Sequence, residues 1–420
     1  MSLIKKYFYG HKPIPVSFEI FKYIGPGLIV TVGFIDPGNW ASNIAAGSQF
    51  GYSLLWMVTL STIMLIILQH NAAHLGIASG LCLSEASTEY FSKTASRSFL
   101  TTSVLAGIST AVAELLGAAI GLNMLFHIPL IIGVIIVAAV IIYFLFTNSY
   151  RIIEKYIIGF VSVIGLSFLY EIFISNADWA QTGIFLFTPV LPENSMVIIM
   201  SVLGAVVMPH NIFLHSEIIQ SRQWQKESEG IIKSKLKYEF VDTLFAMIVG
   251  WAINSSMIIV AAAVFFANKI EVTELQQAQE TLKPLLGNAS SFVFAIALIF
   301  AGFSSSITAS MAGASIFAGI FKEPLDLKDN HSRAGVLITL VGAFIVILFL
   351  SNNPFEGLIW SQVVLSIQLP FTIVALIVLT SSEKVMGAYK NKLSGKIILW
   401  TVALIVIILN IILLKNIFIN

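Results

Sequence analysis

The chain has 420 residues, of which 57% are hydrophobic and only 11% are charged, and its mean hydropathy is +0.91. Soluble domains carry about 25% charged residues, so this composition excludes a soluble protein and indicates an integral membrane protein. Twenty-three Lys and Arg residues nearly balance 22 Asp and Glu residues, which leaves no basic surface for a nucleic acid. The single cysteine, Cys82, excludes an internal disulfide or a thiolate metal cluster within one chain.

Eleven apolar runs have the length that a bilayer requires of a helix, about 20 residues. Nothing before residue 24 is typical of a cleaved signal peptide, so we expect residues 1–23 to form a cytoplasmic N-terminal segment. The sequence thus predicts an all-α polytopic membrane protein. Its eleven transmembrane helices are expected near residues 24–45, 53–75, 98–125, 128–147, 153–175, 197–220, 240–267, 288–317, 334–351, 357–380 and 396–414.

The positive charges alternate between the two sides of this arrangement. Twenty of the 23 Lys and Arg residues fall on one side, and the other side has only Lys269, Lys283 and Lys415. Because short cytoplasmic loops hold the excess of Lys and Arg, we expect the N-terminus in the cytoplasm. An odd number of spans then places the C-terminus outside the cell.

Two spans carry the same unusual sequence pattern. The first contains Asp36–Asn39 (DPGN) and the sixth contains Met208–Asn211 (MPHN). Each proline removes a backbone donor and clashes with the preceding turn, so both helices should be broken near mid-membrane. Since an odd number of spans separates the motifs, the second copy is inverted. We expect inverted repeats at residues 24–175 and 197–380, followed by one additional helix at 396–414.

The side chains at these breaks indicate the substrate class. Asp36 is a carboxylate at membrane depth, which costs at least about 2.5 kcal/mol and calls for a cation. Asn39 adds an amide oxygen, although it could instead cap the second half-helix. Met208 occupies the position in the second motif that Asp36 occupies in the first, and offers a thioether. Magnesium and calcium prefer oxygen ligands, whereas sulfur favours softer ions such as Mn²⁺, Fe²⁺, Co²⁺ or Cd²⁺. The residues therefore predict a site for a divalent transition metal.

An ordered set of motifs along nearly the whole chain resembles one known family. The set is Gly25–Gly27, Asp36–Asn39, Phe50–Tyr52, Leu54–Trp56, Met208–Asn211, Leu214–Ser216, Gln220–Arg222, Val241–Thr243, Asn254, Ser304–Thr308, Ser361–Ser366 and Gln368–Phe371. These residues are similar to those of the Nramp (natural resistance-associated macrophage protein) family of divalent metal-ion transporters, of the bacterial manganese-transport type.

The resemblance implies an amino-acid-transporter-like (LeuT-type) fold of five plus five inverted helices, with helices 1 and 6 broken. It further implies a monomer in the plasma membrane that imports Mn²⁺ or Fe²⁺, and also Cd²⁺ or Co²⁺, together with protons by alternating access. We expect no enzymatic activity and no cofactor besides the transported ion. The implied ligands are Asp36, Asn39, Met208 and the backbone carbonyl of Ala205, with the Gly33 carbonyl and Gln362 approaching the ion in occluded states. For Gln362, ordinary hydrogen bonding between helices is the alternative.

A proton pathway through Asp36, Glu114 and His210 is also expected. Glu114 matches a family acid that is implicated in proton movement, and a histidine such as His210 can titrate near neutral pH. The family usually has a second acid one turn before Glu114, where this chain has Ala111. We therefore expect loose proton coupling. Three other histidines are interpreted as structural, either packed or near a loop: His215, His70 and His74.

The same residues argue against several other classes of protein. A sodium-coupled amino-acid transporter would share the fold, but Asp36 would repel a substrate carboxylate. A channel or a sensor would not need matched breaks in inverted halves. No spacing of residues indicates a hydrolase. The nearest alternative is a transporter of Mg²⁺ or of divalent cations generally, without tight proton coupling; Met208 argues against it.

Overall fold

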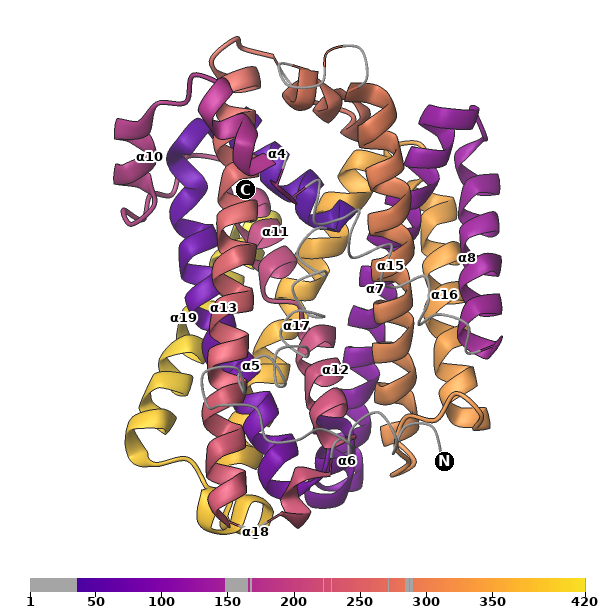
Figure 1. Cartoon of the computed structure of the whole chain (residues 1–420), viewed down its shortest axis with the longest axis vertical. Coiled ribbons are helices and arrows are strands. Elements are labelled where there is room, and N and C mark those ends of the chain that lie inside the picture. The colour runs from indigo at the N-terminus through magenta and orange to yellow at the C-terminus, as the bar shows by residue number, and fades with distance from the viewer. Residues whose placement is uncertain are drawn as a thin grey trace, which may run out of the picture.

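The computed structural model describes residues 36–147, 165–166, 168–221, 223–227, 229–270, 272–283, 287 and 290–419. Within these residues all regular secondary structure is helical, and nine segments are long and apolar enough to cross a membrane. The all-α class predicted from the apolar runs is therefore confirmed. Figure 1 shows the helices as a bundle whose members run mostly along the long axis of the molecule.

The nine segments follow the predicted spans in order. One of them, Pro37–Ser79, joins the second half of the first span to the whole of the second. The fifth span, 153–175, lies mostly outside the described residues. The helices are α4 (Pro37–Phe50), α5 (Leu55–Ser79), α7 (Lys93–Phe126), α8 (Leu130–Thr147), α11 (Met196–Val206), α12 (Pro209–Gln220), α13 (Glu229–Ala261), α15 (Ser290–Gly319), α16 (Asn330–Leu350), α17 (Pro354–Ser381) and α19 (Leu393–Ile419).

One boundary differs clearly from the prediction. The apolar run predicted a helix from residue 240, but α13 begins at Glu229. Its first three turns are polar and include Lys235 and Lys237. Lysine has good helix propensity, but a search for apolar runs does not detect it. The helix therefore continues beyond the apolar part of the span.

Short helices mark the two ends of the bundle. Helices α6 (Leu83–Tyr90) and α18 (Glu383–Met386) lie at one end, and α10 (Trp179–Phe185) lies at the other (Figure 1). The connections after the second and tenth spans thus share an end, and the connection after the fifth lies opposite, as an alternating topology requires. Which end faces the cytoplasm stays a prediction.

The long helices form two packed groups. Helices α4, α5, α11, α12 and α13 form one group, at the left and centre of Figure 1, and α7, α8, α15 and α16 form the other, on the right. Helix α17 contacts members of both groups, including α4, α11 and α7. Helices α4, α11 and α12 therefore belong to one group, and α7, α15 and α17 lie at its boundary with the other.

Burial separates the enclosed helices from the peripheral ones. In the most apolar stretch of Met196–Lys226, which contains α11 and α12, 94% of the residues are buried, against 28% in α8. Peripheral helices expose large apolar side chains such as Ile132, Phe349 and Ile411. In water so much exposed apolar surface would drive association, but in a bilayer it faces lipid. The chain is a multi-pass membrane protein whose interior surrounds α11 and α12.

Candidate functional site

The sixth span is broken where the sequence predicted. Helix α11 ends at Val206 and α12 begins at Pro209, and Met208 between them is extended, with φ −73° and ψ 114°. In a continuous helix, residue 209 would donate its N–H to the carbonyl of Ala205, but proline has no N–H. The Ala205 carbonyl therefore lacks its usual helical donor, and it lies at the end of a buried half-helix.

The described half of the first break is the start of α4. Asp36 caps this helix in an extended conformation, with φ −95° and ψ 160°. Its Oδ1 accepts a hydrogen bond from the backbone N–H of Asn39 at 2.6 Å, and its Oδ2 accepts one from the Asn39 side-chain amide at 2.7 Å. The positive end of the helix dipole favours a carboxylate here. Gly33, predicted on the other side of this break, lies outside the described residues.

Gln362 of α17 lies between the two broken helices. A methyl group added at Gly38 would overlap the side-chain amide of Gln362, and one added at Gly204 would overlap its backbone carbonyl oxygen. Gly38 is two residues from Asp36, and Gly204 precedes Ala205. Only glycine permits both approaches. The structure thus brings α17 to within contact of both breaks.

The amide of Gln362 is incompletely hydrogen-bonded within this arrangement. Its Nε2 donates to the Ser361 hydroxyl at 3.2 Å, while Oε1 is buried and has no hydrogen-bond partner among the residues that the structure describes. Leaving a buried acceptor unsatisfied is costly. A cation held between the breaks would satisfy it.

Met208 is buried beside the second break, with 2% of its surface exposed. Its sulfur accepts a hydrogen bond from the side-chain amide of Asn211 at 3.1 Å, and its other neighbours in the core are Ala106 and Leu365. The amide of Asn211 fixes the position of the sulfur. The last residue of the MPHN motif therefore supports the first, a role that the sequence pattern alone did not assign.

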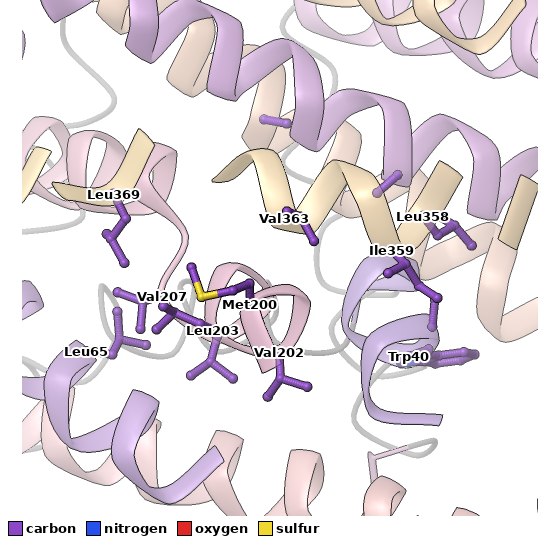
Figure 2. Close-up of a cluster of buried hydrophobic side chains, with 14 of the residues drawn as sticks. Trp40, Leu65, Met200, Val202, Leu203, Val207, Leu358, Ile359, Val363 and Leu369 are labelled. Atoms are coloured by element: carbon purple, nitrogen blue, oxygen red, sulfur yellow. The ribbon is translucent and has the colours of Figure 1, made fainter. Parts of the chain in front are cut away.

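Apolar side chains surround the end of α11. Figure 2 shows Leu65 of α5 close to Leu203 and Val207 beside the break, with Val363 of α17 facing them, and each is at most 1% exposed. Such a shell excludes water and lowers the local dielectric constant, so electrostatic interactions within it are strengthened. The polar groups at the breaks are the exceptions in this shell.

Glu114 of α7 lies next to the first break. A methyl group at Gly117, one turn further along α7, would overlap the ring of Pro37. The carboxyl groups of Glu114 and Asp36 interact electrostatically. Glu114 is 1% exposed, and its Oε2 has no hydrogen-bond partner within the described part of the chain. The structure therefore brings together the two acids that the sequence singled out.

His210 of α12 contacts the same helix through a threonine. Its Nδ1 lies 2.9 Å from the hydroxyl oxygen of Thr110. Residues 110 and 114 are four apart and share one face of a helix, so His210 and Glu114 approach the same face of α7. Ala111, in the position of the missing acid, is fully buried. Thr110 was missed from the sequence, although its spacing from Glu114 could have indicated it.

Sequence comparison relates the chain to a single family. The family model described as "Natural resistance-associated macrophage protein-like" matches residues 27–416. The "Divalent metal cation transporter MntH" of Caldanaerobacter subterraneus is 40% identical over 398 residues, which cover 93% of this chain and 92% of that protein. The protein of the same name from Nostoc sp. is 40% identical over 404 residues, covering 93% and 90%.

Comparison with solved structures gives the same relationship. The crystal structure of the Eremococcus coleocola manganese transporter, in complex with an aromatic bis-isothiourea substituted compound, matches with a TM-score of 0.78 and 28% identity, covering 97% of this chain and 89% of that one. Mhp1, a nucleobase-cation-symport-1 family transporter, matches with a TM-score of 0.58 and 16% identity over 84% of this chain and 77% of that one. This second likeness is one of fold, and it confirms the predicted inverted-repeat transporter fold. The chain belongs to the Nramp family of membrane transporters.

Proposed function

We propose that this protein imports divalent transition-metal ions, Mn²⁺ or Fe²⁺ and also Cd²⁺ and Co²⁺, across the plasma membrane together with protons. The observation that carries the proposal is the position of Gln362, which contacts residues beside both the Asp36 carboxylate and the Ala205–Met208 break. A carboxylate, amide oxygens and a thioether form a donor set of intermediate softness, which suits these ions better than Mg²⁺ or Ca²⁺. The relatives named as metal cation transporters support the same class of substrate.

The ligands we propose are the side chains of Asp36, Asn39 and Met208 and the carbonyl of Ala205. The Gly33 carbonyl and Gln362 join them in occluded states. Asp36 already accepts two hydrogen bonds from Asn39, so the carboxylate and amide are held together before an ion arrives. Such preorganisation reduces the conformational entropy that the ligands lose when an ion binds.

Transport follows from the two breaks. Each break places its ligands on the end of a half-helix, so a tilt of α4 or α11–α12 against α7, α15 and α16 opens one side of the site and closes the other. We propose that the protein works as a monomer, with its N-terminus in the cytoplasm and its C-terminus outside. This orientation rests on the distribution of Lys and Arg.

Uptake by proteoliposomes tests this proposal. Saturable uptake of Mn²⁺ and Cd²⁺ is expected, with Mg²⁺ and Ca²⁺ excluded, and a pH dye in the lumen should report acidification. Uptake of Mg²⁺ equal to that of Mn²⁺ would instead support the alternative, a general divalent-cation transporter without tight proton coupling.

Met208→Ala is expected to change the selectivity among these ions. Loss of the thioether should weaken Cd²⁺ transport about ten-fold or more, since even groups that only orient ligands contribute about 10–100-fold to metal affinity. Transport of Mn²⁺ should weaken less, because sulfur contributes most to the binding of soft ions. The preference of the site for transition ions over Ca²⁺ and Mg²⁺ should become smaller. Competition of each ion with Mn²⁺ measures these changes. If the variant kept the wild-type preference, Met208 would be a packing residue.

The proton part of the proposal starts at Asp36. A carboxylate must be deprotonated to bind a metal, so binding releases its proton. Glu114 interacts electrostatically with Asp36 and has an unsatisfied oxygen within the described structure. We propose that Glu114 and His210 receive the proton. Coupling is loose because Ala111 stands in place of a second acid.

Glu114→Gln should therefore remove most of the metal-driven acidification while Mn²⁺ uptake continues. Ala111→Asp should strengthen acidification more than it changes the apparent Mn²⁺ affinity, because residue 111 is not one of the proposed ligands. Parallel measurements of lumenal pH and Mn²⁺ uptake separate the two effects. If acidification in both variants equalled that of the wild type, protons would take a route that does not include residues 111 and 114.

A further inference from the structure

A second group of titratable side chains lies away from the proposed metal site, where α5, α12 and α13 meet. At its centre is Glu239 of α13, whose side chain is 3% exposed. Its Oε2 lies 2.9 Å from Nδ1 of His70 on α5, and its Oε1 accepts a hydrogen bond from Thr243 at 2.6 Å. The same Oε1 lies 3.9 Å from Nε2 of His215 on α12. The sequence predicted structural roles for His70 and His215, near a loop or in packing. In the structure both face one buried carboxylate.

The contacts of His215 fix which nitrogen faces the acid. Nδ1 of His215 lies 2.5 Å from Oε1 of Gln69, so Nε2 is the atom directed toward Glu239. The ring is buried, at 1% exposure. His215 lies seven residues beyond Met208 on α12, which corresponds to about 10 Å along a helix axis. It is therefore close to the metal site in the fold but separate from its ligands.

The other end of the group reaches a cavity. His70 is 31% exposed and lines a cavity of about 690 Å³, together with Asn71, His74, Glu229 and Lys390. The rings of His70 and His74 are stacked with their centroids 6.3 Å apart, and His74 interacts electrostatically with Glu239. The cavity lies at the α18 end of the molecule, which the Lys and Arg count assigns to the cytoplasm (Figure 1).

The chemistry of these groups is that of proton transfer. Three histidines from two other helices interact with Glu239 in the described structure: His70 and His215 face its oxygens, and His74 interacts with it electrostatically. Ionisable groups inside a membrane protein are costly to bury and commonly mark ion or proton pathways. A chain of histidine, carboxylate and histidine that ends at a cavity large enough to hold water fits a relay better than a structural link, because hydroxyls or amides could join the helices without the cost of charge.

We propose that Glu239 relays protons from His215 to His70 and so to the cytoplasmic cavity. The proton on Nε2 of imidazolium His215 moves to the Glu239 carboxylate, leaving neutral His215 and a carboxylic acid. That acid gives its proton to Nδ1 of neutral His70, and His70 then loses a proton to water in the cavity. The 3.9 Å step requires an approach of about 1 Å or one bridging water. The relay depends on the proton coupling proposed above, and it adds an exit on α5 and α13 beside the route along α7 that Ala111 weakens.

Two variants test the relay by the number of protons moved per metal ion. Glu239→Gln keeps the size of the side chain and a hydrogen-bonding oxygen but cannot accept a proton at neutral pH. His70→Gln removes the next group in the chain. In proteoliposomes, each variant should take up Mn²⁺ at close to the wild-type rate while lumenal acidification per Mn²⁺ falls about 100-fold, the lower end of typical proton-transfer effects. Glu229→Gln removes an acid from the wall of the same cavity and is the matched control, with an unchanged ratio.

The outcomes separate the relay from the proposed function. Coupled uptake by the wild type and equally coupled uptake by both variants would overturn the relay and leave the proposed function standing. Mn²⁺ uptake without acidification in the wild type would overturn proton coupling, and the relay with it. If Glu239→Gln did not elute as a folded protein, His70→Gln would decide alone. Retention of the wild-type ratio by that variant would count against the relay.

Discussion

Replacement of Asp36 by asparagine is expected to abolish saturable uptake of Mn²⁺. The substitution keeps the shape of the side chain but removes the charge of the carboxylate that caps α4. Outer groups that merely orient metal ligands contribute about 10–100-fold to affinity, so loss of the one charged ligand should weaken binding at least about 100-fold. Direct binding of Mn²⁺ to the purified protein, measured by calorimetry, separates this loss from a failure of transport alone.

The fold should survive this substitution, which makes the result interpretable. Asparagine is a good N-cap residue and can still accept the bond that the Asn39 N–H donates to Oδ1 in the wild type. The variant should therefore elute from size exclusion like the wild type. Saturable Mn²⁺ transport by a well-folded Asp36→Asn protein would remove Asp36 from the ligand set.

The second large effect is expected from Gly204→Ala in α11. A methyl group at this position would overlap the backbone carbonyl oxygen of Gln362, and backbone cannot move aside as a flexible side chain can. Alanine gains about 1 kcal/mol over glycine within a helix, whereas overpacking costs about 1–3 kcal/mol or more. Because α11 and α17 would be forced apart at the site, we expect lower thermal stability and loss of transport together.

Gly107→Ala in α7 is the matched control. A methyl group there would meet only the Cα atom of Gly313, at 3.8 Å, which is an ordinary contact. The gain in helix propensity should then leave stability unchanged or slightly higher. Thermal unfolding in detergent followed by fluorescence measures both variants. Equal stability of Gly204→Ala and the wild type would mean that α17 does not press on α11 as described.

Much of the fold could be predicted because its signals are local. Each membrane span is a run of apolar residues, and the break at Met208 follows from a proline inside such a run. The start of α13 was placed wrongly because its first turns, from Glu229, are polar. The length and hydropathy of a run indicate the part of a helix that lies in the bilayer. The helix itself can begin earlier, in polar residues outside the bilayer.

The arrangement of the site depended on contacts between distant residues. Nothing in the spacing of Gln362 indicates that its amide lies against Gly38 and its carbonyl against Gly204. The contact between His70 and Glu239 joins residues 169 positions apart. Side chains at such separations meet only through helix packing, and a single sequence carries no periodicity that reports it. Local motifs therefore identified candidate ligands, and only the tertiary structure placed Gln362 and Glu239.

An ion bound between the two broken helices should be held partly by sulfur. X-ray absorption at the cadmium edge, on purified protein loaded with equimolar Cd²⁺, identifies the neighbours of the ion. We expect a single sulfur neighbour among oxygen ligands in the wild type, and its disappearance in Met208→Ala. A shell of oxygen alone in the wild type, or a sulfur neighbour that persists in Met208→Ala, would remove Met208 from the ligand set.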